Sequence, residues 1–505
     1  MNNLLPYQKE HVKNLCKSIK NYKRALDASD TGTGKTYTSI AICMILKLRP
    51  FVVCPKSVYS SWVKILEHYN YDKSDYDIYT YNELEKHKFI SLKDEEYIWD
   101  FDKSNFKPSE YLFIYDEAHK CKNRLTINAK ILKSLSDFDV NILLLSATIV
   151  DKPFYFIIIG YVLKLYHDFE EGFVWIGNIT KKSKNNMLIS IHDELFNKYA
   201  SRMCIDDIDD LFKKNTIIMD GIEMSNDFEI EQQYDLLNEL MGDKLTNKIS
   251  CIQRIRENIE QLKINTFVRI TNENLKQNKS VAIFVNFTKT LLGLAEKLNT
   301  KCIIYGQQTK EERSENIKLF STDQSRIIIC NIQSGGCGIS LHDTIGNHPR
   351  ISLISPTWSA QDLIQVLGRI RRATGKTDVI QRILFCKNTF EENIGKIIKE
   401  KINNIQMLNN GNKKLKNDNM KQILDNEYKI ITKQKEKDTI IYQTHDFEKI
   451  QNILDKLYEE QQKYMMEIEN PCNQFKIEEL NYRLSKVNKE IDFNETNLTK
   501  SLETL

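Results

Sequence analysis

Short apolar runs alternate with stretches of helical periodicity in two separate parts of the chain, residues 1–155 and residues 271–400. The expected strands are the apolar runs at residues 51–54, 111–115, 141–145, 281–285, 302–305, 327–330 and 351–354. Short apolar strands that alternate with helices are typical of a parallel sheet covered by helices on both faces. The pattern therefore predicts an α/β protein with two parallel-sheet domains in tandem.

The rest of the chain lacks this alternation. Residues 156–270 have a mostly helical pattern, and we predict a helical insertion there. Residues 401–445 are polar and rich in Lys and Asn, which indicates a basic linker. Residues 446–505 have the pattern of two charged helices, which predicts a C-terminal helical hairpin or coiled coil. This hairpin packs on itself or on the rest of the protein, or it binds a protein partner as a coiled coil.

Composition excludes several classes of protein. Of the 505 residues, 41% are hydrophobic and 28% are charged, a balance typical of a soluble globular protein. No apolar window is long enough to span a membrane, and the N-terminus lacks the apolar core of a signal peptide. We therefore expect an intracellular, soluble protein, cytoplasmic or nuclear, or associated with a virion, without a membrane partner. The 11 cysteines include no CxxC pair, which argues against a structural zinc site.

A glycine-containing loop precedes an apolar helix near the N-terminus, where residues 29–36 have the sequence SDTGTGKT. Such a loop points backbone N–H groups and the N-terminus of the helix at phosphate oxygens. We predict that Lys35 contacts the β- and γ-phosphates of ATP and that Thr36 ligates Mg²⁺. The other predicted ATP contacts in this loop are Thr31, Gly32, Thr33 and Gly34. The alternative is a chance match in a surface turn.

Two carboxylates follow the apolar run at residues 111–115. We predict that Asp116 holds Mg²⁺ through the water shell of the ion and that Glu117 orients and deprotonates the water that attacks the γ-phosphate. We expect His119 to couple hydrolysis to movement of the other domain. The alternative is a solvated acidic turn.

An arginine cluster lies near the end of the second predicted domain. Gln365, Arg369 and Arg372 are spaced at i, i+4 and i+7, which predicts that they share one face of a helix. We expect the two guanidinium groups to reach the γ-phosphate held by the first domain and to stabilise the charge that develops during hydrolysis. Arg371 falls off this face and is expected to contact solvent or nucleic acid. The alternative is a basic helix that binds phosphates without specificity.

The order of these segments resembles that of the superfamily 2 helicases and translocases. Residues 116–123 (DEAHKCKN) are similar to the DEAH-x-x-KN segment of Swi/Snf-type ATPases, and residues 358–372 are similar to their QxxGRxxR segment with its upstream Trp. Residues 146–148 (SAT) instead resemble motif III of general helicases, where Swi/Snf enzymes usually carry TGTP. The resemblance covers residues 4–155 and 275–390, and the chain is similar to the compact motors of large DNA viruses and phages.

The resemblance implies two RecA-like domains that bind ATP and Mg²⁺ between them. It implies that Gln8 binds the adenine and that Gly338, with Arg369 and Arg372, completes the nucleotide site. Residues implied in coupling are His119, Ser146, Thr148 and Gln365. Residues implied to contact nucleic acid are Pro55, Lys56, Ser57, Thr80, Ser334, Gly335 and Gly336.

Three functions fit these features. The first is a Swi/Snf-like motor that hydrolyses ATP to move along nucleic acid, with DNA favoured over RNA. The second is a strand-separating DNA or RNA helicase in viral transcription or genome processing, which the SAT sequence supports. The third is a nucleic-acid clamp without enzyme activity. It is disfavoured because the predicted catalytic residues are all present, namely Lys35, Glu117, Arg369 and Arg372.

Overall fold

The computed structural model describes residues 4–411 apart from short gaps, which are residues 94–95, 102–105, 151–154, 183–186, 197, 206, 209–211, 225, 243–247, 336–338, 358, 388 and 390. Within these residues the strands form two six-stranded sheets and one two-stranded sheet. The two large sheets confirm the predicted fold class of two parallel-sheet α/β domains. No helix in this part of the chain is both long and apolar enough to cross a lipid bilayer.

The first sheet, called sheet A, has the strand order β3-β2-β6-β7-β1-β8, and its neighbouring strands all pair in parallel. Its strands are β1 (Arg24–Asp27), β2 (Arg49–Cys54), β3 (Asp77–Thr80), β6 (Tyr111–Asp116), β7 (Asn141–Leu145) and β8 (Ala200–Ser201). An antiparallel pair, β4 (Ile90–Lys93) and β5 (Glu96–Trp99), forms the small sheet. We call sheet A with its helices the first lobe.

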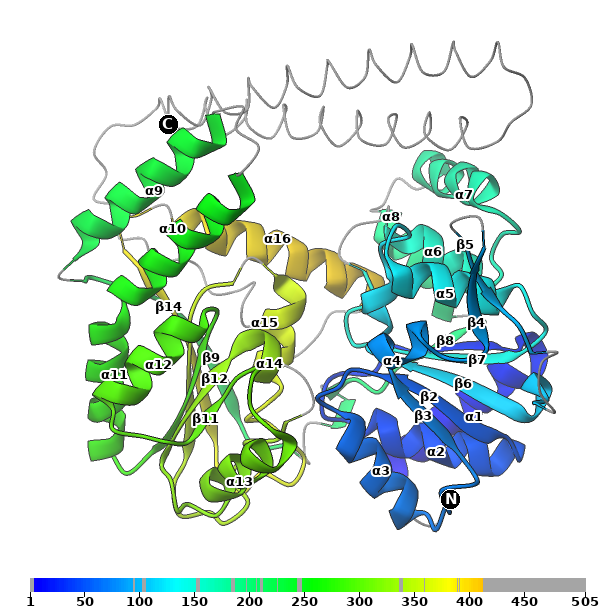
Figure 1. Cartoon of the computed structure of the whole chain (residues 1–505), viewed down its shortest axis with the longest axis horizontal. Helices are drawn as coiled ribbons and strands as arrows, with labels where there is room; N and C mark the ends of the chain where they lie inside the picture. The colour runs from blue at the N-terminus through cyan, green and yellow to red at the C-terminus, as the bar shows by residue number, and fades with distance from the viewer. Residues whose placement is uncertain are drawn as a thin grey trace. The chain divides into compact units, whose positions relative to one another are not determined.

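The helices of the first lobe lie on both faces of sheet A (Figure 1). They are α1 (Pro6–Tyr22), α2 (Lys35–Leu46), α3 (Tyr59–His68), α4 (Tyr81–Glu85), α5 (Ile127–Ser136), α6 (Phe156–Val162), α7 (Phe169–Lys182) and α8 (Met187–Phe196). Two 3₁₀ turns, at Pro108–Glu110 and Ala118–Cys121, flank β6.

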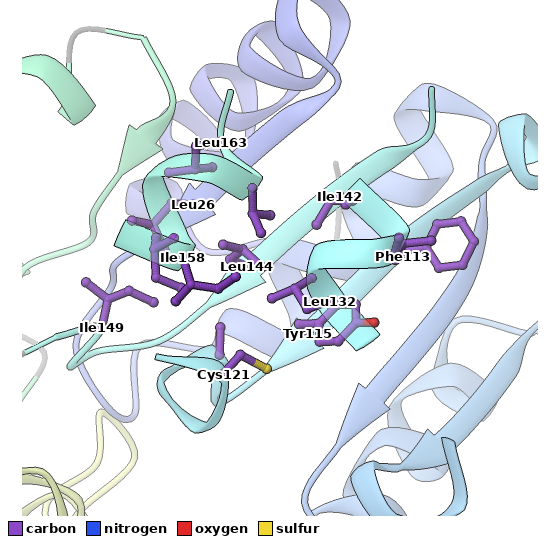
Figure 2. Packing of buried hydrophobic residues seen from close by; sticks show 14 of the residues in the cluster. Leu26, Phe113, Tyr115, Cys121, Leu132, Ile142, Leu144, Ile149, Ile158 and Leu163 are labelled. Carbon is purple, nitrogen blue, oxygen red and sulfur yellow. The ribbon is translucent and has the colours of Figure 1, made fainter. Parts of the chain in front are cut away.

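Alternate residues of the sheet A strands enter two separate cores. In β7, Ile142 and Leu144 face one core, whereas Leu143 and Leu145 face the other. Figure 2 shows the first core, in which Leu132 of α5 packs over the sheet beside residues of α6. Helices α1, α2 and α3 cover the second core. Because both faces are buried, β7 is a continuous apolar run instead of an alternating one.

The second large sheet, called sheet C, has the strand order β11-β12-β10-β13-β14-β9, again with parallel pairs throughout. Its strands are β9 (Asn215–Ile222), β10 (Ser280–Val285), β11 (Ile303–Ile304), β12 (Ile327–Asn331), β13 (Arg350–Ile354) and β14 (Val379–Cys386). The helices beside it are α11 (Ile264–Lys276), α12 (Thr288–Lys297), α13 (Lys310–Ser321), α14 (Ile332–Gly335), α15 (Ala360–Leu367) and α16 (Glu391–Asn410). Phe267 of α11 and Leu291 of α12 bury one face of β10. We call sheet C with these helices the second lobe.

The region predicted as a helical insertion, residues 156–270, is helical over most of its length but also contains two strands that the prediction lacked. Strand β8 pairs with β1 at the edge of sheet A, and β9 pairs with β14 at the edge of sheet C. Strand β8 has only two residues, and β9 places Asp220 and Gly221 inside its apolar pattern. Neither strand therefore gives the continuous apolar run that marked the strands expected from the sequence. Strands β1, β3 and β14 were also not among the expected strands.

Helices α9 (Asp227–Gly242) and α10 (Lys248–Leu262) belong to a compact unit separate from the two sheets. They pack against each other, and the Nδ2 of Asn258 donates a hydrogen bond to the Oε1 of Gln233 at 3.2 Å.

Helix α16 extends beyond residue 400, where we predicted the second domain to end and the linker to begin. Ile402, Ile405 and Leu408 are buried, so an apolar face continues the helix through residues 401–410. The remainder of the predicted linker and the predicted hairpin at residues 446–505 lie outside the described residues.

Candidate active site

Most of the predicted site residues of the first lobe follow the carboxyl ends of parallel strands in sheet A (Figure 1). The loop at residues 29–34 follows β1, residues 55–57 follow β2, Thr80 ends β3, Asp116 ends β6 and Ser146 follows β7. The carboxyl ends of parallel strands share one edge of a sheet, which is where α/β proteins bind ligands. The fold therefore brings these residues to the same edge.

The loop at residues 29–34 is shaped by two glycines with positive φ, Gly32 at 92° and Gly34 at 95°. Residues with a side chain rarely adopt this conformation. Lys35 begins helix α2, and its Nζ donates hydrogen bonds to the carbonyl oxygens of Ser29 at 2.8 Å and Asp30 at 3.2 Å. The ammonium group is therefore held against the loop, where phosphate oxygens can replace the two carbonyls.

The three threonines of this segment differ in their surroundings. Thr33 is buried, and its Oγ1 donates to the carbonyl oxygen of Asp30 at 2.8 Å. Thr31 and Thr36 are half-buried. The hydroxyl of Thr33 thus supports the loop from inside. Thr36 is half-buried at the N-terminus of α2, and its binding of Mg²⁺ stays a prediction.

A buried carboxylate supports the start of the loop. Asp27 ends β1, its Oδ2 lies 3.0 Å from the Nε2 of His11, and its Oδ1 accepts the N–H of Ser29 at 3.0 Å. Burial alone would raise the pKa of Asp27, but the charges of His11 and Lys35 and the hydrogen bonds outweigh burial and lower it. Sequence reasoning missed His11 and Asp27 because no motif marks them.

Gln8 lies on α1 beside the phosphate loop. Its Nε2 donates to the carbonyl oxygen of Thr33 at 2.9 Å, and its Oε1 accepts the N–H of Leu5 at 3.0 Å. The hydroxyl of Tyr7 donates to the same carbonyl of Thr33 at 3.2 Å. Both polar atoms of Gln8 therefore contact protein groups, and its binding of adenine stays a prediction.

Asp116 and Glu117 place a buried and a half-buried carboxylate next to each other at the end of β6. The Oδ2 of Asp116 accepts a hydrogen bond from the Nε1 of Trp62 at 2.8 Å. Burial and the neighbouring charge of Glu117 raise the pKa of Asp116 to about 6. For Glu117, burial opposes ionisation, but the hydrogen bond and the charge of His119 outweigh it and lower the pKa to about 2. A divalent cation would favour the ionised form of Asp116 against both burial and the charge of Glu117.

Glu117 also begins a polar chain toward the end of β7. It has a left-handed backbone, with φ 57° and ψ 49°, which costs a residue with a side chain roughly 1–2 kcal/mol. Its Oε2 lies 3.3 Å from the Nδ1 of His119, and the same nitrogen lies 3.2 Å from the Oγ of Ser146. Ser146 Oγ in turn accepts the N–H of Thr148 at 3.2 Å. The predicted base and the predicted coupling residues are therefore in direct contact.

The predicted helical face for the arginines is wrong. Helix α15 ends at Leu367 and Gly368 is its C-cap, so Arg369 and Arg372 follow the helix and do not continue its face. Glycine commonly ends helices, and here it also permits a close approach. A Cβ added to Gly368 would lie 2.6 Å from the Oγ1 of Thr31 in the phosphate loop.

Arg372 lies against the phosphate loop. Its Nη1 would be 2.3 Å from a Cβ added to Gly32 and has no hydrogen-bond partner among the described residues. Its Nη2 and Nε make only long hydrogen bonds of 3.4 Å, to the carbonyl of Ile339 and the Oγ of Ser340. Burial and the charge of Arg369 lower the pKa of Arg372. A guanidinium group with an open donor at this position suits an anionic ligand on the loop.

The other two arginines of the cluster are buried. Arg369 donates to the carbonyl of Ile339 at 3.3 Å, and its positive charge favours the ionised form of Glu117. Arg371 lies over the ring of Phe212, with its guanidinium carbon 5.3 Å from the ring centre. Our expectation that Arg371 contacts solvent is therefore wrong, because this side chain packs inside the protein.

Gln361 joins the two lobes, although sequence reasoning had selected Gln365. Gln361 Nε2 donates to the carbonyl of Thr148 at 3.0 Å, and its Oε1 accepts from the Nζ of Lys122 at 3.1 Å. Gln365 is buried on the same helix, one turn later. The i, i+4 spacing of the two glutamines is the signal that could have identified Gln361.

The predicted nucleic-acid contacts are placed in several ways. Lys56 is exposed, Ser57 is half-buried and Pro55 is buried. Thr80 caps helix α4, because its Oγ1 accepts the N–H of Glu83 at 3.2 Å. The Thr80 hydroxyl therefore stabilises the start of this helix, and its contact with nucleic acid stays a prediction. Ser334 and Gly335 belong to helix α14, and Gly336 and Gly338 lie outside the described residues.

The oxygen donors at this edge of sheet A fit a magnesium ion. Within the described residues no group of three or more His, Cys, Asp or Glu side chains could hold a metal by itself. Mg²⁺ is usually bound by one or two carboxylates together with substrate phosphates and water. The carboxylate of Asp116 and the hydroxyl of Thr36 are donors of this kind.

Known proteins resemble the chain over both lobes. Residues 2–151 match the family described as "Type III restriction enzyme, res subunit", and residues 262–374 match "Helicase conserved C-terminal domain". Over 452 residues the chain is 35% identical to "Putative ATP-dependent RNA helicase L364" of Acanthamoeba polyphaga mimivirus, covering 81% of this chain and 84% of that protein. Over 178 residues it is 26% identical to the helicase-like transcription factor of Homo sapiens, covering 34% of this chain and 17% of that protein.

A solved structure also resembles the chain, the Sulfolobus solfataricus SWI2/SNF2 ATPase core in complex with dsDNA. It shares 22% sequence identity, and the match covers 81% of this chain and 93% of the other. The TM-score is 0.35, which is too low to support a conclusion about the fold of this chain.

Proposed function

We propose that this chain, which belongs to the superfamily 2 helicases, translocates along duplex DNA. Enzymes of this superfamily couple ATP hydrolysis to unwinding of nucleic acid or to translocation along it. The observation that carries the proposal is the position of Lys122, in the segment that resembles Swi/Snf-type ATPases. Lys122 donates to Gln361, which also contacts Thr148. A residue of the Swi/Snf-like segment in the first lobe thus contacts a residue of the second lobe, which supports a role in transmitting movement between the lobes.

ATP lies on the phosphate loop in this proposal. Lys35 would exchange its carbonyl partners for β- and γ-phosphate oxygens. Thr36 and Asp116 would hold Mg²⁺, which would supply positive charge beside the phosphates. Glu117 stays ionised near neutral pH because its pKa is lowered to about 2, so it can orient the attacking water through a hydrogen bond.

The second lobe contributes positive charge to the same reaction. The open Nη1 of Arg372 faces the loop at Gly32 and would bind the γ-phosphate, where negative charge spreads during hydrolysis. Loss of the γ-phosphate then removes the anion that attracts the second lobe. The polar chain from Glu117 through His119 and Ser146 would transmit this change to Thr148, whose carbonyl oxygen accepts a hydrogen bond from Gln361.

Nucleic acid is held mainly through its phosphates, by exposed groups such as Lys56 and by backbone N–H groups near Ser334. Contacts with phosphates do not distinguish one base sequence from another, and the affinity that they provide falls steeply as the salt concentration rises. We therefore propose low sequence specificity.

A second candidate function is a helicase that separates RNA strands. The observation that favours it is the name of the mimivirus relative, which is 35% identical over most of both chains and is called an RNA helicase. The sequence SAT at residues 146–148, typical of general helicases, is consistent with it.

The first experiment measures ATP turnover of the full-length chain with no nucleic acid, single-stranded DNA, duplex DNA, single-stranded RNA and duplex RNA. Salt is fixed, because phosphate contacts make binding salt-dependent. The Glu117→Gln variant is the blank, since its amide keeps the size of the side chain but cannot accept a proton. We expect the greatest stimulation by duplex DNA. Greatest stimulation by either RNA would contradict the proposal and support the second candidate.

The second experiment separates translocation from unwinding. A third strand bound to duplex DNA is displaced by a motor that moves along the duplex, whereas a labelled strand of the duplex itself is released only by unwinding. We expect ATP-dependent displacement of the third strand while the duplex stays paired. Efficient release of the duplex strand would show that the protein is a strand-separating helicase.

A further inference from the structure

Helix α16 begins beside sheet C but ends among residues of the first lobe. At its start, the Oε2 of Glu391 accepts the N–H of Cys386, the last residue of β14, at 2.7 Å. At its end, the Nδ1 of His192 on α8 lies 2.8 Å from the carbonyl oxygen of Leu408. A Cβ added to Gly411 would lie only 2.5 Å from the ring of His192, so the chain passes close to α8. One helix is therefore tied to both lobes.

Asn409 contacts the segment that links hydrolysis to the second lobe. Its side chain is buried, and its Nδ2 donates to the carbonyl oxygen of Ala147 at 2.7 Å. Ala147 lies between Ser146, which contacts His119, and Thr148, which contacts Gln361. Asn409 thus fixes the backbone in the middle of this segment.

Asn410 reaches the phosphate loop through one intermediate. Its Oδ1 accepts from Arg202, and Arg202 donates to the Oδ1 of Asp30 in the loop. The side chains of Arg202 and Asp30 are 5% and 8% exposed, so water screens this ion pair little. The Oδ2 of Asp30 accepts the N–H of Ile205 at 2.9 Å, and the carbonyl of Asp30 accepts from Lys35.

We propose that Asn409 and Asn410 are positioning residues for ATP hydrolysis. Asn409 holds residues 146–148 in the geometry that transmits hydrolysis, and Asn410 holds Arg202 so that the phosphate loop keeps its shape. The inference rests on the proposed ATP site, but it does not depend on whether the nucleic acid is DNA or RNA.

The two asparagines use opposite hydrogen-bonding groups, which makes one substitution informative at both positions. Asn409 donates, whereas Asn410 accepts. An ionised aspartate can only accept. Asn409→Asp therefore loses its hydrogen bond and places a negative charge against the carbonyl of Ala147, while Asn410→Asp keeps the acceptor that Arg202 needs.

We expect Asn409→Asp to lower the nucleic-acid-stimulated kcat about tenfold, the effect of one lost buried hydrogen bond, with little change in the KM for ATP. We expect Asn410→Asp to change kcat and the KM for ATP much less than Asn410→Leu does, because the acceptor for Arg202 is kept. Asn410→Leu keeps the approximate size but removes the acceptor, and we expect it to raise the KM for ATP about tenfold through a displaced phosphate loop. All measurements use the full-length chain and the nucleic acid that stimulates it most.

Two further variants keep the test decisive. Glu400→Gln changes an exposed residue of the same helix and should leave kcat and KM unchanged. Asn409→Ala removes the donor without adding charge and replaces Asn409→Asp if that variant does not fold. Equal kinetics for the two Asn→Asp variants, or lowered thermal midpoints with unchanged kcat and KM, would overturn the proposal. Retained turnover in Lys35→Ala would instead show that the ATP site itself is misplaced.

Discussion

The two lobes hold their charged site residues in different ways. In the first lobe, Lys35 donates at 2.8 Å and 3.2 Å, and Asp116 accepts from Trp62 at 2.8 Å. In the second lobe, Arg372 donates at 3.4 Å to both of its described partners and keeps an open Nη1. The first-lobe side chains thus make short hydrogen bonds to protein groups, whereas Arg372 makes long ones and has a donor that would suit an anion on the phosphate loop.

This difference suggests that the two lobes have separate roles in nucleotide binding and in hydrolysis. A change in the first lobe should disturb an arrangement on which both binding and chemistry depend. A change at Arg372 should leave the loop intact and remove only charge that is needed as the γ-phosphate departs.

The largest effect is expected for Lys35→Ala. This substitution removes the cation that contacts the carbonyls of Ser29 and Asp30 and that is proposed to bind the phosphates. We expect ATP turnover to fall by roughly 10³-fold or more, because phosphoryl transfer depends on such charges. Phosphate release and binding of a fluorescent nucleic acid are measured together, and nucleic-acid binding should change little. Lys17→Ala, at an exposed position on α1, is the matched control.

Arg372→Ala should have the next largest effect. We expect it to bind ATP nearly as well as the unchanged chain but to hydrolyse it roughly 10²- to 10³-fold more slowly, by loss of the charge near the γ-phosphate. Binding of a labelled nucleotide and single-turnover hydrolysis separate the two steps. Arg371→Ala is the neighbouring control: it should lower the thermal midpoint, because Arg371 packs over Phe212, and should affect hydrolysis less. Normal hydrolysis by Arg372→Ala would remove this residue from the catalytic set.

The division between the lobes also explains what could be predicted from the sequence. Several first-lobe residues were predictable because they follow the short apolar strands β2, β6 and β7, and parallel strands bring such positions to one edge. The phosphate loop was predictable from its own sequence, although β1 before it gives no apolar run. The pairing of Asp116 with Glu117 and the loop at Gly32 and Gly34 are local features of the chain. Their neighbours in sequence are also their neighbours in space.

The contacts across the lobes were not predictable in this way. The helical spacing of Arg369 and Arg372 was misleading, because Gly368 ends α15 before them. Gln361 and Asn409 meet residues 148 and 147 only after the two lobes have folded. No local pattern in the sequence specifies contacts between residues more than 200 positions apart. Strand β8 was missed for a different reason, because a strand of two residues shows no periodicity.

Gly368→Ala tests the close approach of the two lobes, and we expect a smaller effect. The added Cβ would lie 2.6 Å from the Oγ1 and 2.8 Å from the Cβ of Thr31. Relief of such an overlap costs about 1–3 kcal/mol, so we expect turnover to fall roughly tenfold. Thr31→Gly removes both atoms, and the double variant should recover turnover relative to Gly368→Ala alone. Strictly additive effects in the double variant would show that the two residues do not meet.

The smallest expected effect is a pH dependence of the stability of the chain that arises from His342 in the second lobe. Burial, together with the charges of Arg372 and Arg350, lowers the pKa of His342 to about 4. The folded chain therefore keeps His342 neutral at pH values where the unfolded chain binds a proton, so stability is full above about pH 6.5 and falls as the pH decreases toward 4.

His342→Gln cannot titrate but can still hydrogen-bond to Thr374, whose Oγ1 lies 2.8 Å from the Nε2 of His342. Between pH 7.5 and 5.5, we expect the thermal midpoint of the unchanged chain to decrease by about 1–3 °C more than that of the variant. Asp343 and the other carboxylates titrate in both proteins, so their contribution cancels in this difference. Equal decreases in the two proteins would mean that His342 is protonated at the same pH in the folded and the unfolded chain.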